Sequence, residues 1–219
     1  MKLLGLDTAT MTAGIAILDG DRVLVDARHD ASGRSADLLV AIDAAFARAG
    51  FAPTELDAIS IGAGPGSFTG LRIGMATAKG IAFATGRPLW MVSTLAALAE
   101  DARQSLPPAR RIHVAAIDAR RGEIYAACYG PDLALLGVER VLPPGELAAW
   151  VAELAGDLPI VVAGDGLASY REALAPLADR WLPIATPSGV GVARLALAGP
   201  RTDMLAAGAP RTSGPPRPR

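Results

Sequence analysis

Residues 59–74 read Ile59-Ser-Ile-Gly-Ala-Gly-Pro-Gly-Ser-Phe-Thr-Gly-Leu-Arg-Ile-Gly74. The apolar start predicts a buried strand, and the glycines with one proline predict a tight turn, because glycine adopts positive φ and proline fixes φ. Ser67 or Thr69 can cap the helix that follows, since a hydroxyl accepts from unpaired first-turn N–H groups. Such a turn suits an anion at the helix N-terminus, but it also suits a strand-to-helix connection without a ligand. The loop alone leaves both interpretations open.

The composition limits the classes of protein to consider. The chain has 219 residues, of which 51% are hydrophobic, and a net charge of −1. This length provides one large core or two small lobes, and the balanced charge gives no electrostatic sign of nucleic-acid binding. The single cysteine, Cys128, excludes an internal disulfide and is expected in the core. Asp7 interrupts the first apolar run, and no run is long enough to span a bilayer, so we expect a cytoplasmic protein without signal peptide or anchor.

The spacing of apolar residues predicts an α/β protein with two similar halves. Strands are expected at residues 2–7, 13–18, 22–27, 57–61, 89–92, 112–118, 123–129 and 160–163. Helices are expected at residues 35–49, 69–85, 93–102, 144–155, 169–178 and 188–198.

The segment Gln104–Arg111 contains two prolines and is the best candidate for a linker. On each side of it, a strand, turn and strand are followed later by a strand that ends in a glycine turn. We therefore expect lobes at residues 1–103 and 111–198 with a cleft between them. Residues 199–219 are rich in proline, glycine and arginine and are expected to be disordered.

Candidate catalytic groups are few. His29 and His113 are far apart and have no partner at metal-ligand spacing, so no transition-metal site is indicated. His113 lies in an apolar strand and is expected to be a hydrogen-bonded core residue rather than a base. Ser67 lacks the Gly-x-Ser-x-Gly spacing of a hydrolase nucleophile.

Three carboxylates end or follow predicted strands: Asp7, Asp118 and Asp165. They can hold Mg²⁺ or cap loops, and the second interpretation is favoured. The hydroxyl-rich turn Thr8–Thr12 can hold a phosphate or satisfy its own backbone. The candidate nucleotide or phosphate loops therefore contain Asp7, Thr8, Gly64, Gly66, Ser67, Gly164, Asp165 and Gly166.

Small residues recur every fourth position in the predicted helix 69–85, at Gly70, Gly74 and Ala78. A glycine inside a helix costs roughly 1 kcal/mol relative to alanine, so a packing reason is expected. The missing side chains allow close approach either to the protein's own sheet or to the helix of a partner.

Taken together, these motifs resemble the TsaB (YeaZ) family, the accessory subunits for threonylcarbamoyladenosine formation on bacterial tRNA. The resemblance rests on Gly64–Gly74 with Ala78-Lys79-Gly80, Leu4–Thr8, Ile117–Tyr125 and Gly164–Gly166, and it covers residues 1 to about 198. It implies an actin/Hsp70/sugar-kinase-like (ASKHA) fold of two related lobes, each with a mixed sheet flanked by helices. It also implies partnership with the catalytic paralogue TsaD and the ATPase TsaE.

The resemblance also separates this chain from TsaD. TsaD carries a metal-binding His-x-x-x-His where this sequence has Thr94 and Leu98, and acidic residues where it has Met11 and Thr12. The implied protein has no catalytic residues and no metal, and its phosphate loops are vestigial. It needs no cofactor of its own, although ATP or ADP with Mg²⁺ can bind at the interface with TsaD. The tail from Thr202 lacks the Tyr-Leu-Arg-like segment usual in the family.

The implied function is a scaffold that binds and activates TsaD in threonylcarbamoyl transfer to adenosine 37 of ANN-decoding tRNAs. The chain would reach tRNA only through the complex and form a homodimer when alone. The alternative is a small-molecule ATPase or phosphotransferase that holds Mg-ATP with Asp7, Thr8–Thr12 and Asp165. The predicted partner-binding residues come from the helices at 35–49 and 69–85: Leu38, Leu39, Ile42, Phe46, Gly70, Gly74, Thr77, Ala78 and Ile81.

Overall fold

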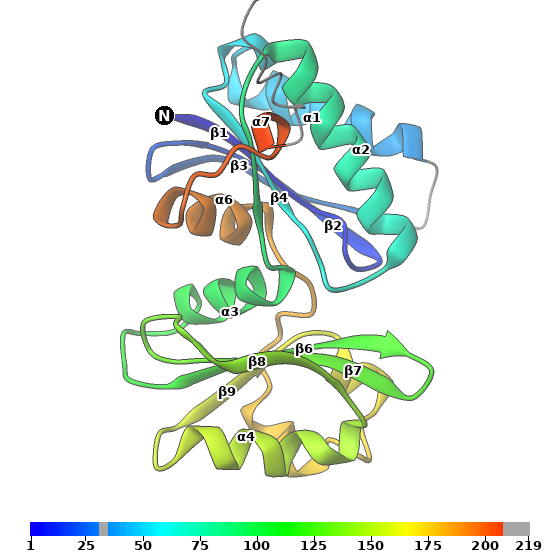
Figure 1. Cartoon of the computed structure of the whole chain (residues 1–219), viewed down its shortest axis with the longest axis vertical. Helices are drawn as coiled ribbons and strands as arrows, with labels where there is room; N and C mark the ends of the chain where they lie inside the picture. Colours follow the sequence, from blue (N-terminus) through cyan, green and yellow to red (C-terminus); the bar gives the residue numbers. More distant parts are fainter. Residues whose placement is uncertain (31–34, 208–219) are drawn as a thin grey trace, which may run out of the picture.

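Two β-sheets, one above the other in Figure 1, organise the computed structural model, which describes residues 1–30 and 35–207. The first sheet has the order β3-β2-β1-β4-β5 and the second the order β8-β7-β6-β9. The strands of the first sheet are β1 (Lys2–Asp7), β2 (Thr12–Asp19), β3 (Arg22–Asp30), β4 (Ala58–Gly62) and β5 (Leu89–Val92). Those of the second are β6 (Ile112–Arg120), β7 (Glu123–Tyr129), β8 (Leu135–Leu142) and β9 (Ile160–Ala163).

The two sheets repeat one topology. In the first, β1 pairs antiparallel with β2, β2 antiparallel with β3, and β1 parallel with β4. In the second, β6, β7, β8 and β9 repeat these pairings in the same order. A parallel bridge from Val162 to Trp181 stands where the first sheet has β5. The predicted duplication is therefore visible in the connectivity of the strands.

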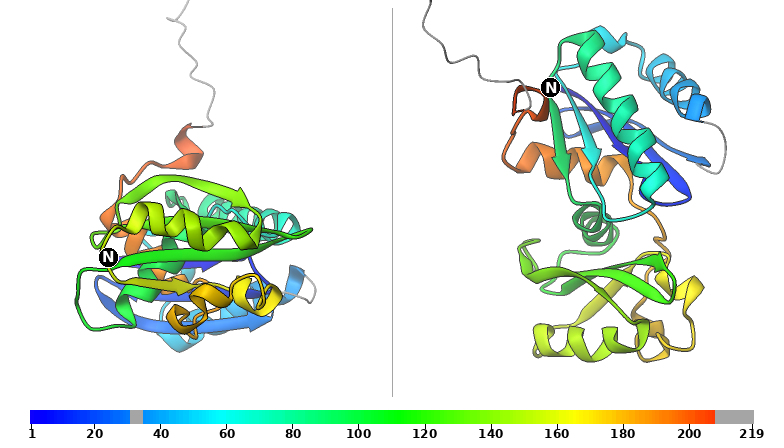
Figure 2. Two further views of the ribbon diagram at one scale, coloured as in Figure 1. Left: turned by 90° about the horizontal axis from the view of Figure 1, so that it is seen from below. Right: turned by 45° about the vertical axis from the view of Figure 1, so that its right-hand side comes forward.

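The helices form layers on both sides of each sheet (Figures 1 and 2). Helices α1 and α2 cover the outer face of the first sheet and α4 covers that of the second, while α3 and α6 lie between the sheets. The helices are α1 (Ser35–Ala49), α2 (Phe68–Thr85), α3 (Thr94–Gln104), α4 (Leu147–Ala155), α5 (Gly166–Ser169), α6 (Gly189–Ala198) and α7 (Met204–Ala207). Short 3-10 turns occupy Pro53–Glu55, Pro144–Glu146 and Ala175–Arg180.

The halves exchange their inner helices. Helix α3 follows the first sheet but packs on β6, β7 and β9, whereas α6 follows the second sheet but packs on β1, β2, β4 and β5. The approach of α6 is close, because a Cβ added at Gly5 would lie 2.1 Å from the carbonyl oxygen of Gly189. The expectation that residues 111–198 form the second lobe therefore does not fit α6, whose side chains complete the core of the first.

Three sequence predictions differ from the structure. Strand β8 was not predicted, because it is an edge strand whose residues are mostly exposed and show little apolar alternation. The predicted helix at 169–178 is wrong, since Pro176 disfavours a helical residue before it, and α5 and a 3-10 turn take its place. The predicted disorder from residue 199 is wrong up to Ala207, because α7 is formed there, and residues 208–219 lie outside the described residues.

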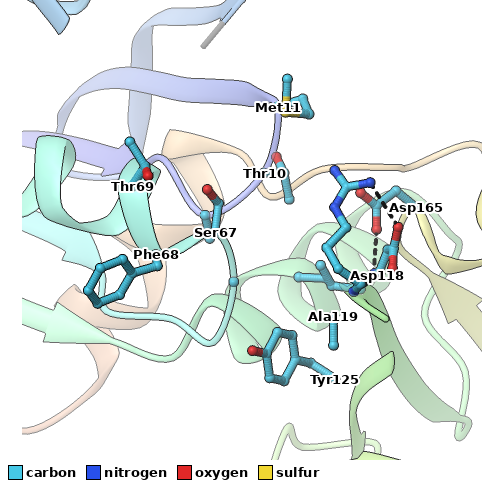
Figure 3. Close-up of a pocket in the computed structure, with 13 residues that line it drawn as sticks. Thr10, Met11, Ser67, Phe68, Thr69, Asp118, Ala119, Tyr125 and Asp165 are labelled. Carbon is cyan, nitrogen blue, oxygen red and sulfur yellow. Dashed lines mark hydrogen bonds and ion pairs between the residues drawn. The ribbon is translucent and has the colours of Figure 1, made fainter. Parts of the chain in front are cut away.

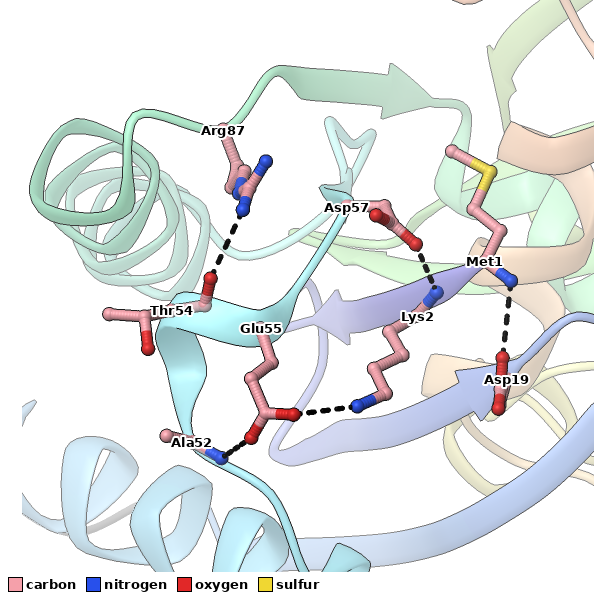
Figure 4. Close-up of polar contacts among 8 residues, drawn as sticks. All are labelled: Met1, Lys2, Asp19, Ala52, Thr54, Glu55, Asp57 and Arg87. Atoms are coloured by element: carbon pink, nitrogen blue, oxygen red, sulfur yellow. Dashed lines mark hydrogen bonds and ion pairs between the residues drawn. The ribbon is translucent and has the colours of Figure 1, made fainter.

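Polar contacts hold the outer end of the first sheet (Figure 4). The N-terminal ammonium donates to Asp19 at 3.1 Å, and the Lys2 backbone N–H donates to Asp57 at 2.7 Å. The Lys2 ammonium donates to Glu55 at 2.9 Å. Exposed ion pairs of this kind contribute at most about 1 kcal/mol. The contacts connect the start of β1 to the end of β2 and to the segment before β4.

Candidate functional site

The first candidate site is a cavity of about 300 Å³ between the two halves (Figure 3). The loop after β1 and the glycine-rich loop before α2 line one side with Thr10, Ser67 and Thr69. The end of β6 and the turn after β9 line the other side with Asp118 and Asp165. The cavity therefore brings together loops that are far apart in the sequence.

Asp7 does not line this cavity, although it was predicted to belong to the phosphate loops. Its side chain is fully buried, and its two oxygens accept hydrogen bonds from the Ala9 backbone N–H at 2.9 Å and the Thr94 hydroxyl at 2.8 Å. Burial raises the pKa of this carboxyl to about 6, because the charged form is poorly solvated. Asp7 thus joins the loop after β1 to the start of α3.

Asp118 and Asp165 lie together at the cavity, and each stabilises a turn. Asp118 accepts hydrogen bonds from the Arg120 backbone N–H and the Tyr170 hydroxyl, both at 2.7 Å, and from the Ser169 hydroxyl at 2.9 Å. Partial burial opposes its ionisation, but these hydrogen bonds hold the pKa of Asp118 below its usual range. Asp165 accepts a hydrogen bond from the Asp118 backbone N–H at 2.8 Å. Burial raises the pKa of the Asp165 carboxyl.

The glycine-rich loop directs its polar groups into the protein. Ser67 caps α2, as predicted, by accepting from the Gly70 backbone N–H at 3.3 Å. The Ser67 N–H donates to the Ala9 carbonyl at 2.7 Å, and the Gly64 N–H donates to the Thr94 hydroxyl at 3.1 Å. The Thr8 hydroxyl donates to the Gly70 carbonyl at 2.9 Å. These groups of the predicted phosphate loop are therefore already used in packing it.

In the second half, the Gly164–Gly166 turn packs against β6. A Cβ at Gly164 would lie 1.9 Å from the Ala116 carbonyl oxygen, and one at Gly166 would lie 3.1 Å from it. A side chain at Gly164 would push the turn off the strand. Close packing explains these two glycines without a ligand.

The second candidate site is an open apolar groove on the outer face of α1 and α2, with a volume of about 820 Å³. On α2, Phe83 is 86% exposed and Phe68 is 67% exposed, which is unusual for large apolar side chains. The groove is lined by Leu39, Arg72, Ile73, Ala76, Thr77, Gly80, Ile81 and Ala84.

Only part of the predicted partner-binding set lies on this groove: Leu39, Thr77 and Ile81. The prediction is wrong for six residues that point into the chain. A Cβ at Gly74 would lie 2.1 Å from the Thr8 hydroxyl oxygen, so the glycine face of α2 packs on the loop after β1. The six inward residues are Leu38, Ile42, Phe46, Gly70, Gly74 and Ala78.

The sequence did contain a signal for the exposed face. A second row of small residues, Ala76, Gly80 and Ala84, recurs every fourth position along the same helix. Two rows with this spacing lie on different sides of one helix. Periodicity alone does not say which row faces the sheet.

Comparisons with known proteins agree with this architecture. The family model for TsaD, tRNA N6-adenosine threonylcarbamoyltransferase, matches residues 27–176. The Escherichia coli (strain K12) tRNA threonylcarbamoyladenosine biosynthesis protein TsaB is 31% identical over 202 residues, covering 84% of this chain and 86% of that protein. The chain belongs to the TsaB (YeaZ) family. The resemblance inferred from its motifs is confirmed.

Solved structures place this TsaB-family chain in its fold class. The crystal structure of a Pseudomonas aeruginosa protein with similarity to peptidase YEAZ is 33% identical, covers 95% of this chain and 93% of that one, and has a TM-score of 0.77. The activator of 2-hydroxyisocaproyl-CoA dehydratase from Clostridium difficile, with bound ADPNP, has a TM-score of 0.58 at 12% identity, covering 90% and 95% of the two chains. The latter likeness concerns the fold alone. The predicted two-lobed ASKHA fold is confirmed.

Of the four positions at which the resemblance separated this chain from TsaD, Thr94 and Leu98 are buried, whereas Met11 is 51% exposed. Leu98 is fully buried among the side chains between α3 and the second sheet. Thr94 is fully buried, and its hydroxyl joins Asp7 to Gly64. Within residues 1–30 and 35–207, no group of three or more histidine, cysteine, aspartate or glutamate side chains could hold a metal ion. No helix of that part is long and apolar enough to cross a membrane.

Proposed function

We propose that this chain is a non-catalytic subunit in tRNA threonylcarbamoyladenosine biosynthesis. It binds a TsaD-type paralogue and activates threonylcarbamoyl transfer to adenosine 37 of ANN-decoding tRNAs. The observation that carries the proposal is the exposed apolar groove between α1 and α2. Leu39, which lines the groove, is 52% exposed, and Phe83 of the same helix α2 that forms most of the groove is 86% exposed. An exposed apolar surface of this kind marks a site of protein association.

The cleft supports a non-catalytic role. The carboxylates of Asp7, Asp118 and Asp165 all accept hydrogen bonds from neighbouring turns. A general base or nucleophile needs a side chain that reaches a substrate, and Asp7 is fully buried. The catalytic groups of the complex then belong to the TsaD-type partner.

The groove also supports a proposal for the assembly. Burying one large apolar side chain stabilises a complex by roughly 1.5–3 kcal/mol, so Phe83, Leu39 and Ile81 are the main expected contributors. Without TsaD, a second copy would cover the same surface in a two-fold homodimer. The TsaE-type ATPase and the tRNA join through the complex in the cytoplasm, with any ATP or ADP and Mg²⁺ at the interface with TsaD.

The substitution Gly80→Arg tests the proposed surface. Gly80 lines the groove, and a Cβ added there meets nothing within 4 Å, so the chain should fold normally. An arginine would place a charge and a long side chain in the interface. We expect the affinity for the TsaD-type partner, measured by calorimetry, to fall at least tenfold, together with stimulation of transfer.

The matched control is Ala152→Arg, which places an arginine at an exposed position on α4 of the other half. We expect this variant to bind and stimulate like the parent chain. If Gly80→Arg binds the partner as tightly as the control, the α1–α2 face is not the docking surface.

The second candidate function is a small-molecule ATPase or phosphotransferase. The cavity of about 300 Å³ favours it, because three residues that carry hydroxyl groups, Thr10, Ser67 and Thr69, line it. The buried position of Asp7 disfavours it. Calorimetry of the isolated chain with Mg-ATP distinguishes the candidates, since micromolar binding with turnover would favour the enzyme.

A further inference from the structure

A second cavity lies at the start of β6, at the opposite end of that strand from the cleft. It has a volume of about 320 Å³ and is lined by the segment that connects α3 to β6. Its polar side chains are Arg103 and Gln104 from the end of α3, and Arg111 and His113 from the connection and β6. All four carry N–H groups, so the cavity is rich in hydrogen-bond donors.

His113 is the unusual member of this group. Its side chain is 1% exposed, and its Nδ1 atom has no hydrogen-bond partner among the described residues. The expectation of a hydrogen-bonded core histidine is therefore wrong at this atom. A buried polar atom without a partner costs about 1–3 kcal/mol, and in a native structure such an atom needs an explanation.

The arginines are held in place but keep free donors. Arg103 donates through Nε and Nη2 to the two oxygens of Glu100 at 2.8 and 3.0 Å, and Gln104 donates to the same carboxylate at 2.8 Å. Arg111 donates through Nη1 to the Pro107 carbonyl at 2.7 Å. This leaves Nη1 of Arg103 and Nη2 of Arg111 without partners in the described part of the chain. Glu100 neutralises the guanidinium of Arg103, so the positive charge of Arg111 remains.

The charges around the ring favour an anion there. Burial lowers the pKa of His113, the Arg111 and Arg103 charges lower it further, and Glu100 opposes them. Across the strands, His113 pairs with Tyr129 on β7 and Val161 on β9. The Tyr129 hydroxyl donates to Glu139 at 3.3 Å. An oxyanion would offset the guanidinium charges and accept a hydrogen bond from an N–H of the imidazole ring.

We propose that this cavity binds the phosphate group of a small phosphorylated molecule, with Arg103 and Arg111 as charged donors and the His113 ring as a third donor. A phosphate oxyanion accepts hydrogen bonds from several directions, which matches donors on α3, the connection and β6. A cavity of about 320 Å³ is at the lower end of the range for ligand pockets, so the molecule is small. The site shares no residue with the α1–α2 groove, so its test does not depend on the proposed function.

Nuclear magnetic resonance of the imidazole rings tests the site directly. The chain has two histidines, so a His29→Gln variant assigns both sets of signals. Inorganic phosphate is titrated into the full chain at constant ionic strength maintained with sodium chloride. We expect saturable shifts of the His113 signals and a rise in the pKa of its ring, with His29 unchanged. Equal shifts from chloride alone, or no shift of His113, would overturn the proposal.

Two neighbouring arginines provide matched variants. Arg111 lines the cavity, whereas Arg110 is exposed and does not. We expect Arg111→Gln to weaken phosphate binding at least tenfold by calorimetry and Arg110→Gln to change it less than twofold. Equal losses in both variants would mean a general electrostatic attraction and no built site. If Arg111→Gln does not fold, the histidine titration of the parent chain decides the matter.

Discussion

Individual glycines of α2 have opposite surroundings although they belong to one helix. A Cβ at Gly74 would meet the Thr8 hydroxyl oxygen at 2.1 Å, whereas one at Gly80 meets nothing within 4 Å. The first glycine is needed for packing inside the chain. The second carries the helix penalty of a glycine, roughly 1 kcal/mol relative to alanine, with no close packing inside the chain to require it.

This contrast predicts opposite effects of the same substitution. Gly80→Ala should raise the free energy of unfolding of the isolated chain by roughly 1 kcal/mol, because alanine favours the helix. Gly74→Ala should lower it by about 1–3 kcal/mol, since the added methyl group forces Thr8 to move. Urea denaturation at a chain concentration low enough to keep monomers measures both. Equal effects of the two substitutions would contradict the packing described here.

Buried carboxylates predict an unusual dependence of stability on pH. Burial raises the pKa of Asp7 and of Asp101 to about 6 from an ordinary 3.8. Between these values the folded chain binds protons that the unfolded chain has lost, so these groups increase stability as the pH falls from 7 towards 5. His113 acts in the opposite direction, because its lowered pKa favours the neutral ring in the folded chain.

Comparing the stability of the Asp101→Asn variant with that of the parent chain isolates the contribution of Asp101 to this pH dependence. Asparagine cannot ionise, but it can still accept a hydrogen bond from the Ser188 backbone N–H, as Asp101 does at 2.6 Å. We expect the free energy of unfolding of the variant to rise less than that of the parent chain when the pH falls from 7 to 5. The difference should be about 1.4 kcal/mol for each unit by which the pKa of Asp101 is raised. Urea denaturation of both chains at pH 5 and pH 7 measures this difference. An equal rise in the free energy of unfolding in both chains would contradict the role of Asp101.

Helices α3 and α6 are the elements that join the halves. The exchange places Val190, Ala193 and Ala196 of α6 against Trp90 and the inner face of the first sheet. The chain thus returns to the first sheet after completing the second. A lobe here is a spatial unit and does not correspond to a continuous stretch of sequence.

Truncation tests this exchange. A chain that ends at Pro187 lacks α6 and α7. It exposes the inner face of the first sheet, whose last strand ends at Val92, far from α6 in the sequence. We expect hydrogen exchange in β1, β2 and β4 to become much faster, because Leu3, Leu18 and Ala58 lose their cover. The control chain ends at Ala207 and keeps every described element. Protection of the first sheet equal to the control would contradict the role of α6.

Across both halves, the exchanged helices should make unfolding cooperative. Neither sheet retains its full core without a helix from the other half of the chain. Tryptophans report on both halves, since Trp90 packs with α6 and Trp150 lies in the core of the second sheet. The molecule is therefore expected to unfold in one transition although it has two sheets.

Cys128 provides an independent measure of that transition. Its thiol is fully buried, and burial raises its pKa to about 12, so it should not react with a thiol reagent while the chain is folded. We expect labelling of Cys128 in urea to follow the same curve as tryptophan fluorescence. Two separated curves, with one half opening first, would contradict cooperative unfolding.

Much of the architecture was predictable from local patterns. Apolar runs and helical spacing identified eight of the strands and the helices α1, α2, α3, α4 and α6. Strand β8 was not predicted, because an exposed edge strand does not need alternating apolar residues. The motif Gly64–Gly74 indicated the family, because it resembles the long signature of the TsaB (YeaZ) family. These features depend on neighbours in sequence, which is why they can be read without coordinates.

Other features depended on which surfaces meet in space. Helical spacing grouped Gly70, Gly74 and Ala78 on one face, but the loop containing Thr8 decided that this face points inward. The same spacing predicted α6 but could not show that it returns to the first sheet. His113 was expected to be hydrogen-bonded, and the unpaired Nδ1 beside two arginines appears only when α3, the connection and β6 come together. Local propensity defines each element and its faces, whereas long-range packing selects the neighbour of each face.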